Sequence, residues 1–203
     1  MTYPDFYDRI ASMNLYDPLS DFLGAVEDGI VEIEYLDCVK LAGHSCPTVA
    51  GAYLMTLMGL QHLYPDTHPV RGTIKVEMRD DETAGVTGVT CNVISYIVGA
   101  SGKNGFKGIQ GNFSRDNLVA YNQPIDGEVR LTRLDTDESV TLSYDPSIIP
   151  ADPMMQPLMA KALQGTASPQ EKKRFGELWQ ERVAKILTDI SIWNKLVTIK
   201  EGK

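Results

Sequence analysis

The segment from Gly43 to Pro47 brings an imidazole and a thiol within two positions of each other, immediately before a long apolar stretch. His44 and Cys46 both offer donor atoms that divalent metals accept, and a cysteine beside an imidazole can also act as a nucleophile. Pro47 has the fixed φ that suits the first position of a helix, so Cys46 is expected to be the N-cap residue. Unpaired N–H groups and the positive end of the helix dipole favour a thiolate there. The segment therefore predicts a metal site or a reactive thiol.

The stretch that follows, residues 48–63, contains no Asp, Glu, Lys or Arg. It is apolar nearly all the way round a helix, which is typical of a helix buried in the interior. A structural interpretation is the alternative, because free cysteines are often buried and a histidine can be a satisfied polar group. The cap position beside an imidazole favours the functional interpretation, because a thiol that only fills the core does not need it.

A third candidate donor, Cys91, falls in the early turns of a second predicted helix over residues 86–98. The β-branched residues of this segment make a strand the alternative. Beyond it, glycines recur every three residues from Gly99 to Gly111, with Lys103 among them. Glycine lets backbone approach a bound anion closely, but the run matches neither a Walker motif nor a dinucleotide-binding motif. We expect a tight loop over the site, with a phosphate cradle as the alternative. Lys103 is a candidate for orienting an anionic group, and a solvated loop lysine is the alternative that the pattern favours.

Composition restricts the class of protein. The chain has 203 residues, a net charge of -8 and dispersed basic residues, which argues against binding to nucleic acid. Residues 1–10 lack the apolar core of a secretory signal, and no uncharged run is long enough to cross a bilayer. Three cysteines in such a chain favour ligand or thiol roles over disulfides. We expect a soluble, cytoplasmic protein with no membrane partner.

The remaining pattern predicts an α+β fold, with a mixed or antiparallel sheet packed against the buried helix and a helical C-terminal tail. Residues 1–150 are expected to form the core and residues 151–203 a helical extension. The expected strands span residues 31–36, 73–78, 128–134 and 139–144, the last two forming a hairpin. The expected helices span residues 3–11, 18–26, 155–163 and a longer segment that follows the capping box Ser168 to Glu171.

The run from Gly43 to Pro47, followed by Thr48-Val49-Ala50-Gly51-Ala52-Tyr53-Leu54, resembles the FmdE family, named for one subunit of formylmethanofuran dehydrogenase. A second, looser similarity joins Cys91 to Gly99, Gly102 and Lys103, so that the resemblance covers roughly residues 36–106. The chain departs from the family pattern at Ala42, where a second histidine is typical. It also lacks the C-terminal zinc finger of some relatives, because no cysteine follows Cys91. The resemblance implies an α+β core, a metal site and a homodimer.

Our leading hypothesis is a divalent metal held by His44, Cys46 and Cys91, with one coordination position open and with Cys46 and Lys103 in catalytic roles. Two thiolates and an imidazole suit zinc, and less selectively nickel or iron. Cys38 is an alternative to Cys91, and His62 or His68 could also reach the site. Two other hypotheses stay open: a non-catalytic accessory dimer that carries a metal or cofactor for a redox enzyme, and metal-free chemistry with Cys46 as nucleophile and His44 as base.

Overall fold

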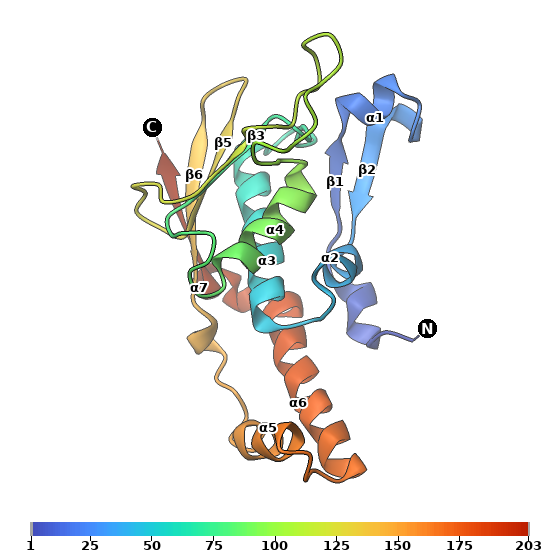
Figure 1. The fold of residues 1–203 in the computed structure, drawn as a ribbon, viewed down its shortest axis with the longest axis vertical. Helices are drawn as coiled ribbons and strands as arrows, with labels where there is room; N and C mark the ends of the chain where they lie inside the picture. Colours follow the sequence, from blue (N-terminus) through green and yellow to red (C-terminus); the bar gives the residue numbers. More distant parts are fainter. Residues whose placement is uncertain (1, 203) are drawn as a thin grey trace.

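The computed structural model describes residues 2–202, which form seven α-helices and seven strands (Figure 1). The helices are α1 Pro18–Phe22, α2 Tyr35–Ala42, α3 Pro47–Leu63, α4 Thr87–Val98, α5 Met155–Leu163, α6 Pro169–Thr188 and α7 Trp193–Leu196. The strands are β1 Met13–Tyr16, β2 Ile30–Ile33, β3 Ile74–Met78, β4 Val119–Ala120, β5 Val129–Arg133, β6 Ser139–Tyr144 and β7 Val197–Gly202. The predicted α+β class is confirmed.

The main sheet has the strand order β4-β3-β5-β6-β7. Only the β3–β4 pair is parallel, so the sheet is mixed, as predicted. The predicted hairpin is β5 and β6, in which Leu131 lies opposite Val140. Both strands alternate, and their buried residues Val129, Leu131, Val140 and Leu142 form one apolar face.

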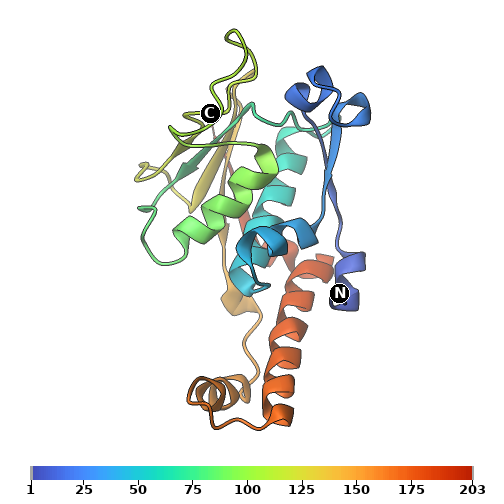
Figure 2. The ribbon, with the colours of Figure 1, turned by 45° about the vertical axis from the view of Figure 1, so that its right-hand side comes forward.

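Helix α3 lies against that face and is covered on its other sides by α2, α4 and α6 (Figures 1 and 2). Nearly every residue from Val49 to Leu60 is buried, which confirms the prediction of an interior helix. Two glycines let it approach the sheet: a Cβ at Gly51 would collide with the ring of Tyr144, and one at Gly59 would lie 3.0 Å from Leu142 Cδ1. The close contact between α3 and β6 therefore depends on the absence of side chains at these two positions.

The N-terminal region differs from the sequence prediction. The strand expected over residues 31–36 ends at Ile33, because Glu34 and Asp37 form a reciprocal capping box that starts α2 at Tyr35. The first expected helix is only a 3-10 turn, Asp5–Arg9. Strand β1 was not predicted; it pairs with β2 in a separate two-stranded sheet.

The predicted helical tail is present as α5 and α6, which project from the body as an arm with α5 crossing the far end of α6 (Figures 1 and 2). The arm has its own small apolar cluster of Met155, Leu158 and Leu178. The second half of α6 instead joins the main core. Strand β7, which was not predicted, then returns to the sheet and pairs with β6. Residues 197–202 of the expected extension therefore lie in the core sheet.

In the described part of the chain, residues 2–202, none of the helices combines the length and the apolar character needed to cross a lipid bilayer.

Substituting Gly51 by alanine should destabilise the protein by about 1–3 kcal/mol, because the new methyl group must displace the Tyr144 ring or push α3 off the sheet. Gly176 is the matched control, since it lies within α6 with nothing within 4 Å of its Cβ position. Gly176→Ala should leave stability unchanged or raise it by up to about 1 kcal/mol. Urea unfolding of both variants tests this, and equal stabilities would contradict the packing described here.

Candidate functional site

The turn between α2 and α3 carries His44, Ser45 and Cys46. Helix α2 ends at Gly43, which has a φ of 75°, in the left-handed region. Nothing lies within 4 Å of its Cβ position, so the backbone conformation rather than crowding calls for glycine there. Gly43 thus reverses the chain and presents the next three residues at the start of the buried helix.

His44 is exposed, and its ring is oriented by the backbone. Its Nδ1 lies 2.9 Å from the carbonyl oxygen of Ala42. A carbonyl only accepts hydrogen bonds, so Nδ1 carries a proton, and in the neutral imidazole the free lone pair is then on Nε2. Metal-binding histidines are commonly fixed in this way, with one nitrogen donating to a backbone carbonyl and the other free to ligate.

Cys46 is buried and occupies the N-cap of α3, as predicted. The backbone N–H of Val49 donates to its Sγ at 3.4 Å. The Tyr144 ring is near this thiol; burial raises the pKa of the Tyr144 phenol, and Cys46 contributes in the same direction. The Tyr144 hydroxyl is buried and has no hydrogen-bond partner within residues 2–202. Because a buried hydroxyl without a partner costs about 1–3 kcal/mol, a water molecule or a ligand is expected beside it.

Ser45, between the two donors, is fixed by α6. Trp179 Nε1 and Gln180 Nε2 donate to the Ser45 carbonyl oxygen at 2.9 and 3.2 Å. The Ser45 hydroxyl donates to Gln180 Oε1 at 3.0 Å, so the Tyr35 hydroxyl, 3.0 Å away, donates to it in turn. We call this set of four bonds the Ser45 clamp. The sequence has no local signal for the clamp, because Trp179 and Gln180 lie about 135 positions from Ser45.

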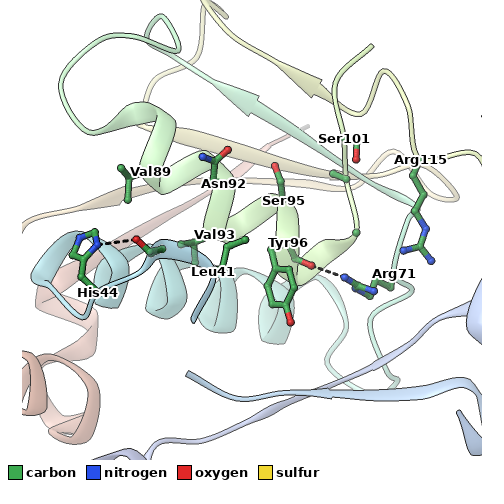
Figure 3. Close-up of a pocket in the computed structure, with 13 residues that line it drawn as sticks. Leu41, His44, Arg71, Val89, Asn92, Val93, Ser95, Tyr96, Ser101 and Arg115 are labelled. Carbon is green, nitrogen blue, oxygen red and sulfur yellow. Dashed lines mark hydrogen bonds between the residues drawn. The ribbon is translucent and has the colours of Figure 1, made fainter. Parts of the chain in front are cut away.

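A pocket of about 480 Å³ runs from this turn along α4 (Figure 3). His44 stands at one end, and Arg71 and Arg115 stand at the other. Between them the lining is mixed: apolar Leu41, Ala42, Val89, Val93 and Ala100, and polar Asn92, Ser95, Tyr96 and Ser101. Its volume and mixed lining are typical of sites for small organic molecules.

The two arginines at the end of the pocket share one buried carboxylate. Asp17 is fully buried, and its oxygens accept from Arg71 Nη1 at 3.0 Å and from Arg115 Nη2 at 2.5 Å. Burial alone would raise the pKa of Asp17, but hydrogen bonds from the Ser20 backbone and from both guanidinium groups outweigh it and hold the pKa below its usual range. Asp17 also caps α1. The cluster ties together the start of α1, the segment before β3 and the segment after the glycine-rich loop, beside the pocket.

Comparison with models of protein families shows to which family the chain belongs. The model of the FmdE family, described as "Molybdenum formylmethanofuran dehydrogenase operon", matches residues 41–191. The chain belongs to the FmdE family. Comparison with curated proteins gave no match. The FmdE match begins just before the His44 turn and extends through α6, so it includes Ser45 and its two partners on α6.

The third predicted metal ligand, Cys91, is buried in α4 and is not part of the pocket lining, although Ser95, one turn further along the helix, is. Its Sγ lies 3.6 Å from Ser95 Oγ, and burial raises its pKa. Cys38 lies in α2 with no exposed surface, and burial raises its pKa to about 12. Over residues 2–202, no group of three His, Cys, Asp or Glu side chains is close enough together to hold a metal.

The remaining candidates lie elsewhere. Lys103 is exposed in the glycine-rich loop and does not line the pocket, where Arg71 and Arg115 supply the positive charge instead. His62 is 16 residues beyond Cys46, about 24 Å along α3, and its Nε2 lies 3.4 Å from Glu201 Oε1. His68 is exposed in the loop that follows the same far end of α3. The sequence had no signal for the two arginines, because neither belongs to a recognisable motif.

Weakening the Ser45 clamp should make Cys46 more accessible while leaving the fold intact. Trp179→Phe and Gln180→Ala each remove bonds worth about 1 kcal/mol, so alkylation of Cys46 by iodoacetamide should accelerate about five-fold. Site-resolved mass spectrometry measures this, with Cys38 and Cys91 as internal controls. Gln170→Ala, an exposed position at the start of α6, should change nothing. An unchanged Cys46 rate in both clamp variants would show that α6 does not position the turn.

Proposed function

We propose that this FmdE-family protein binds a divalent metal through His44 and Cys46, with zinc as the first choice and nickel or iron as alternatives. The observation that carries the proposal is the His44 hydrogen bond to Ala42, which leaves Nε2 free two residues from a thiol at a helix N-cap. The unpartnered Tyr144 hydroxyl near Cys46 adds support, because it calls for a further polar group at this place.

The donors fit a metal in type, but the described residues do not assemble a complete set. His44 and Cys46 are two donors, whereas catalytic zinc sites take three from the protein. Cys91 remains the proposed third ligand, and because the described residues do not group it with His44 and Cys46, its use requires a shift of α4 or of the turn. A metal bound there would supply Lewis-acid activation of a bound oxygen. The chain's own residues position the metal: the Ala42 carbonyl orients the imidazole, and the Ser45 clamp fixes the turn.

The family description also supports a partner. Because the family is named for the operon of a molybdenum formylmethanofuran dehydrogenase, we propose that the chain works in the cytoplasm with a redox enzyme of that kind, as a homodimer. Whether it catalyses a step itself or serves as an accessory protein is a separate question. The projecting α5–α6 arm favours the accessory role, because it carries exposed apolar residues far from the core, among them Leu163, which is 82% exposed.

Metal content tests the ligand assignment. After reconstitution with zinc and removal of excess metal, the wild-type protein should retain about one equivalent by elemental analysis, and EDTA should remove it. His44→Ala and Cys46→Ala should each lose the metal, since removing one of so few donors lowers affinity strongly. Cys91→Ser tests the third ligand. His62→Ala, at the far end of α3, should bind like the wild type. Full metal retention in both the His44 and the Cys46 variants would reject the proposal.

The arm tests the accessory role. When the chain is co-expressed with the components of the redox enzyme encoded in the same operon, we expect a stable complex that survives chelation. Leu163→Glu, in the arm, should weaken that complex, whereas Ile190→Glu, which is also highly exposed but lies beyond the arm, should not. A complex that stays intact in both variants would argue against docking through the arm. Turnover that disappears with EDTA and returns with metal would instead assign a catalytic role.

A further inference from the structure

We propose that the pocket along α4 binds a small organic molecule through an anionic group, a carboxylate or a phosphate, which is received by Arg115. The pocket lies beside His44, the residue proposed above as a metal ligand. The inference rests on that proposed function and adds the chemical class of the ligand that the pocket binds. Anion binding by Arg115 does not require the metal, so the two proposals can fail separately.

The Asp17 cluster leaves one positive charge without a partner. It contains two guanidinium groups and a single carboxylate. Arg71 is fully used, because its Nε donates to Ile97 O, its Nη2 to Tyr96 O and its Nη1 to Asp17. Arg115 bonds only through Nη2, and within residues 2–202 its Nε and Nη1 have no protein acceptor. Arg115 therefore keeps both a charge and hydrogen-bond donors for a ligand.

One free donor of Arg115, Nη1, borders the pocket, whereas Nε lies on the side of Gly72. Nη1 lies 3.2 Å from the position that a Cβ at Gly99 would occupy, and Gly99 is part of the lining. Gly99 caps the C-terminus of α4 with a φ of 70°. Because it has no side chain, it also leaves the Arg115 guanidinium uncovered. The Ser101 hydroxyl borders the same end of the pocket and has no partner within the described residues (Figure 3). A guanidinium with a neighbouring hydroxyl is a suitable receptor for carboxylate or phosphate oxygens.

The charge around the pocket is unusual for this protein. The chain has 27 acidic residues and a net charge of -8. In the described range, however, no Asp or Glu lines this pocket, whereas two arginines and a histidine do. The other large pockets, beside Glu128 and beside Glu201, include acidic side chains. A smaller pocket that shares Arg71 and Arg115 has no Asp or Glu among its described lining residues either. An anion is therefore attracted here and repelled from most of the surface.

The rest of the lining indicates what the anionic group is attached to. Leu41, Val89, Val93 and Ala100 provide an apolar wall between Arg115 and His44. A molecule with a flat or aliphatic body and one acidic end would place the acid at Arg115 and extend its other end towards His44 Nε2. The pocket thus selects an amphipathic acid rather than a free inorganic ion.

Binding of three probes tests the proposal: benzoate, its neutral isostere benzamide, and phenyl phosphate, in buffer without phosphate and with EDTA. Backbone amide signals of Gly99, Ala100 and Ser101 and the Arg115 Nε–H signal report binding by NMR. We expect saturable shifts with benzoate, phenyl phosphate or both, and affinity for benzamide at least about ten-fold lower. Tighter binding of phenyl phosphate would assign a phosphate ester, and tighter binding of benzoate a carboxylate.

Two kinds of variant separate the ligand site from the fold. Arg115→Met removes the receptor but also one partner of Asp17. Asn92→Asp is therefore the sharper change, because Asn92 is exposed in the pocket, has no hydrogen-bond partner in the described range and gains only a charge. It should weaken acid binding about ten-fold. Asn194→Asp, exposed on α7, adds the same charge elsewhere and should have no effect.

The proposal would be overturned if benzamide and benzoate bound equally well, or if neither acid gave a saturable shift. It would also be overturned if the shifts lay outside the pocket, or if Asn92→Asp bound the acid like the wild type. His44→Ala should keep the affinity for the acid within about two-fold of the wild type. If instead acid binding requires His44 or added metal, the acid is a metal ligand and the assignment to Arg115 is wrong. Because EDTA is present throughout, this experiment measures acid binding in metal-free protein. Its result can therefore be interpreted even if the protein does not bind metal.

Discussion

The burial of α3 on every side is the constraint on which the rest of the structure depends. A helix with almost no charged residue must be covered by a sheet on one face and by other helices around the remainder. That requirement brings α2, α4 and α6 to it, and it leaves only the two ends of the helix near solvent. The chemical groups of the site lie at one of these ends, where the unpaired N–H groups of the helix need partners.

The position of α6 links the arm to the site. The second half of α6 belongs to the core that covers α3, and the same helix reaches the turn through Trp179 and Gln180. Movement of the arm is therefore mechanically connected with the turn that carries His44 and Cys46. A site built on an isolated surface loop would lack such a connection.

Much of the fold could be predicted because its signals are local. The Pro47 helix start, the Cys46 cap, the β5–β6 hairpin and the Ser168 capping box each depend on a few neighbouring residues. Strand β7 and the contacts of Ser45 depend on partners more than 50 positions away, and nothing in the local pattern specifies them. The start of α2 was missed for another reason, because an alternation of apolar and acidic residues concealed the Glu34 capping box.

The candidate site shows the same division. His44 and Cys46 were found because their spacing and their place before Pro47 are visible in the sequence. Cys91 was correctly placed in a helix, but periodicity alone does not show which neighbour a given helix face meets. Arg115 was missed because its role arises from a charge imbalance around Asp17, and the three residues involved are spread over 98 positions.

The return of β7 to the sheet has a consequence during protein synthesis. Residues 145–196 separate β6 from β7, so a ribosome that adds 5–20 residues per second needs roughly 3–10 s to make the intervening segment. During this interval β6 is paired with β5 on one side only, and the backbone groups on its other side are free to pair with another chain. The nascent protein is therefore most prone to aggregation while the helical arm is being translated, and chaperones would be most useful to it then.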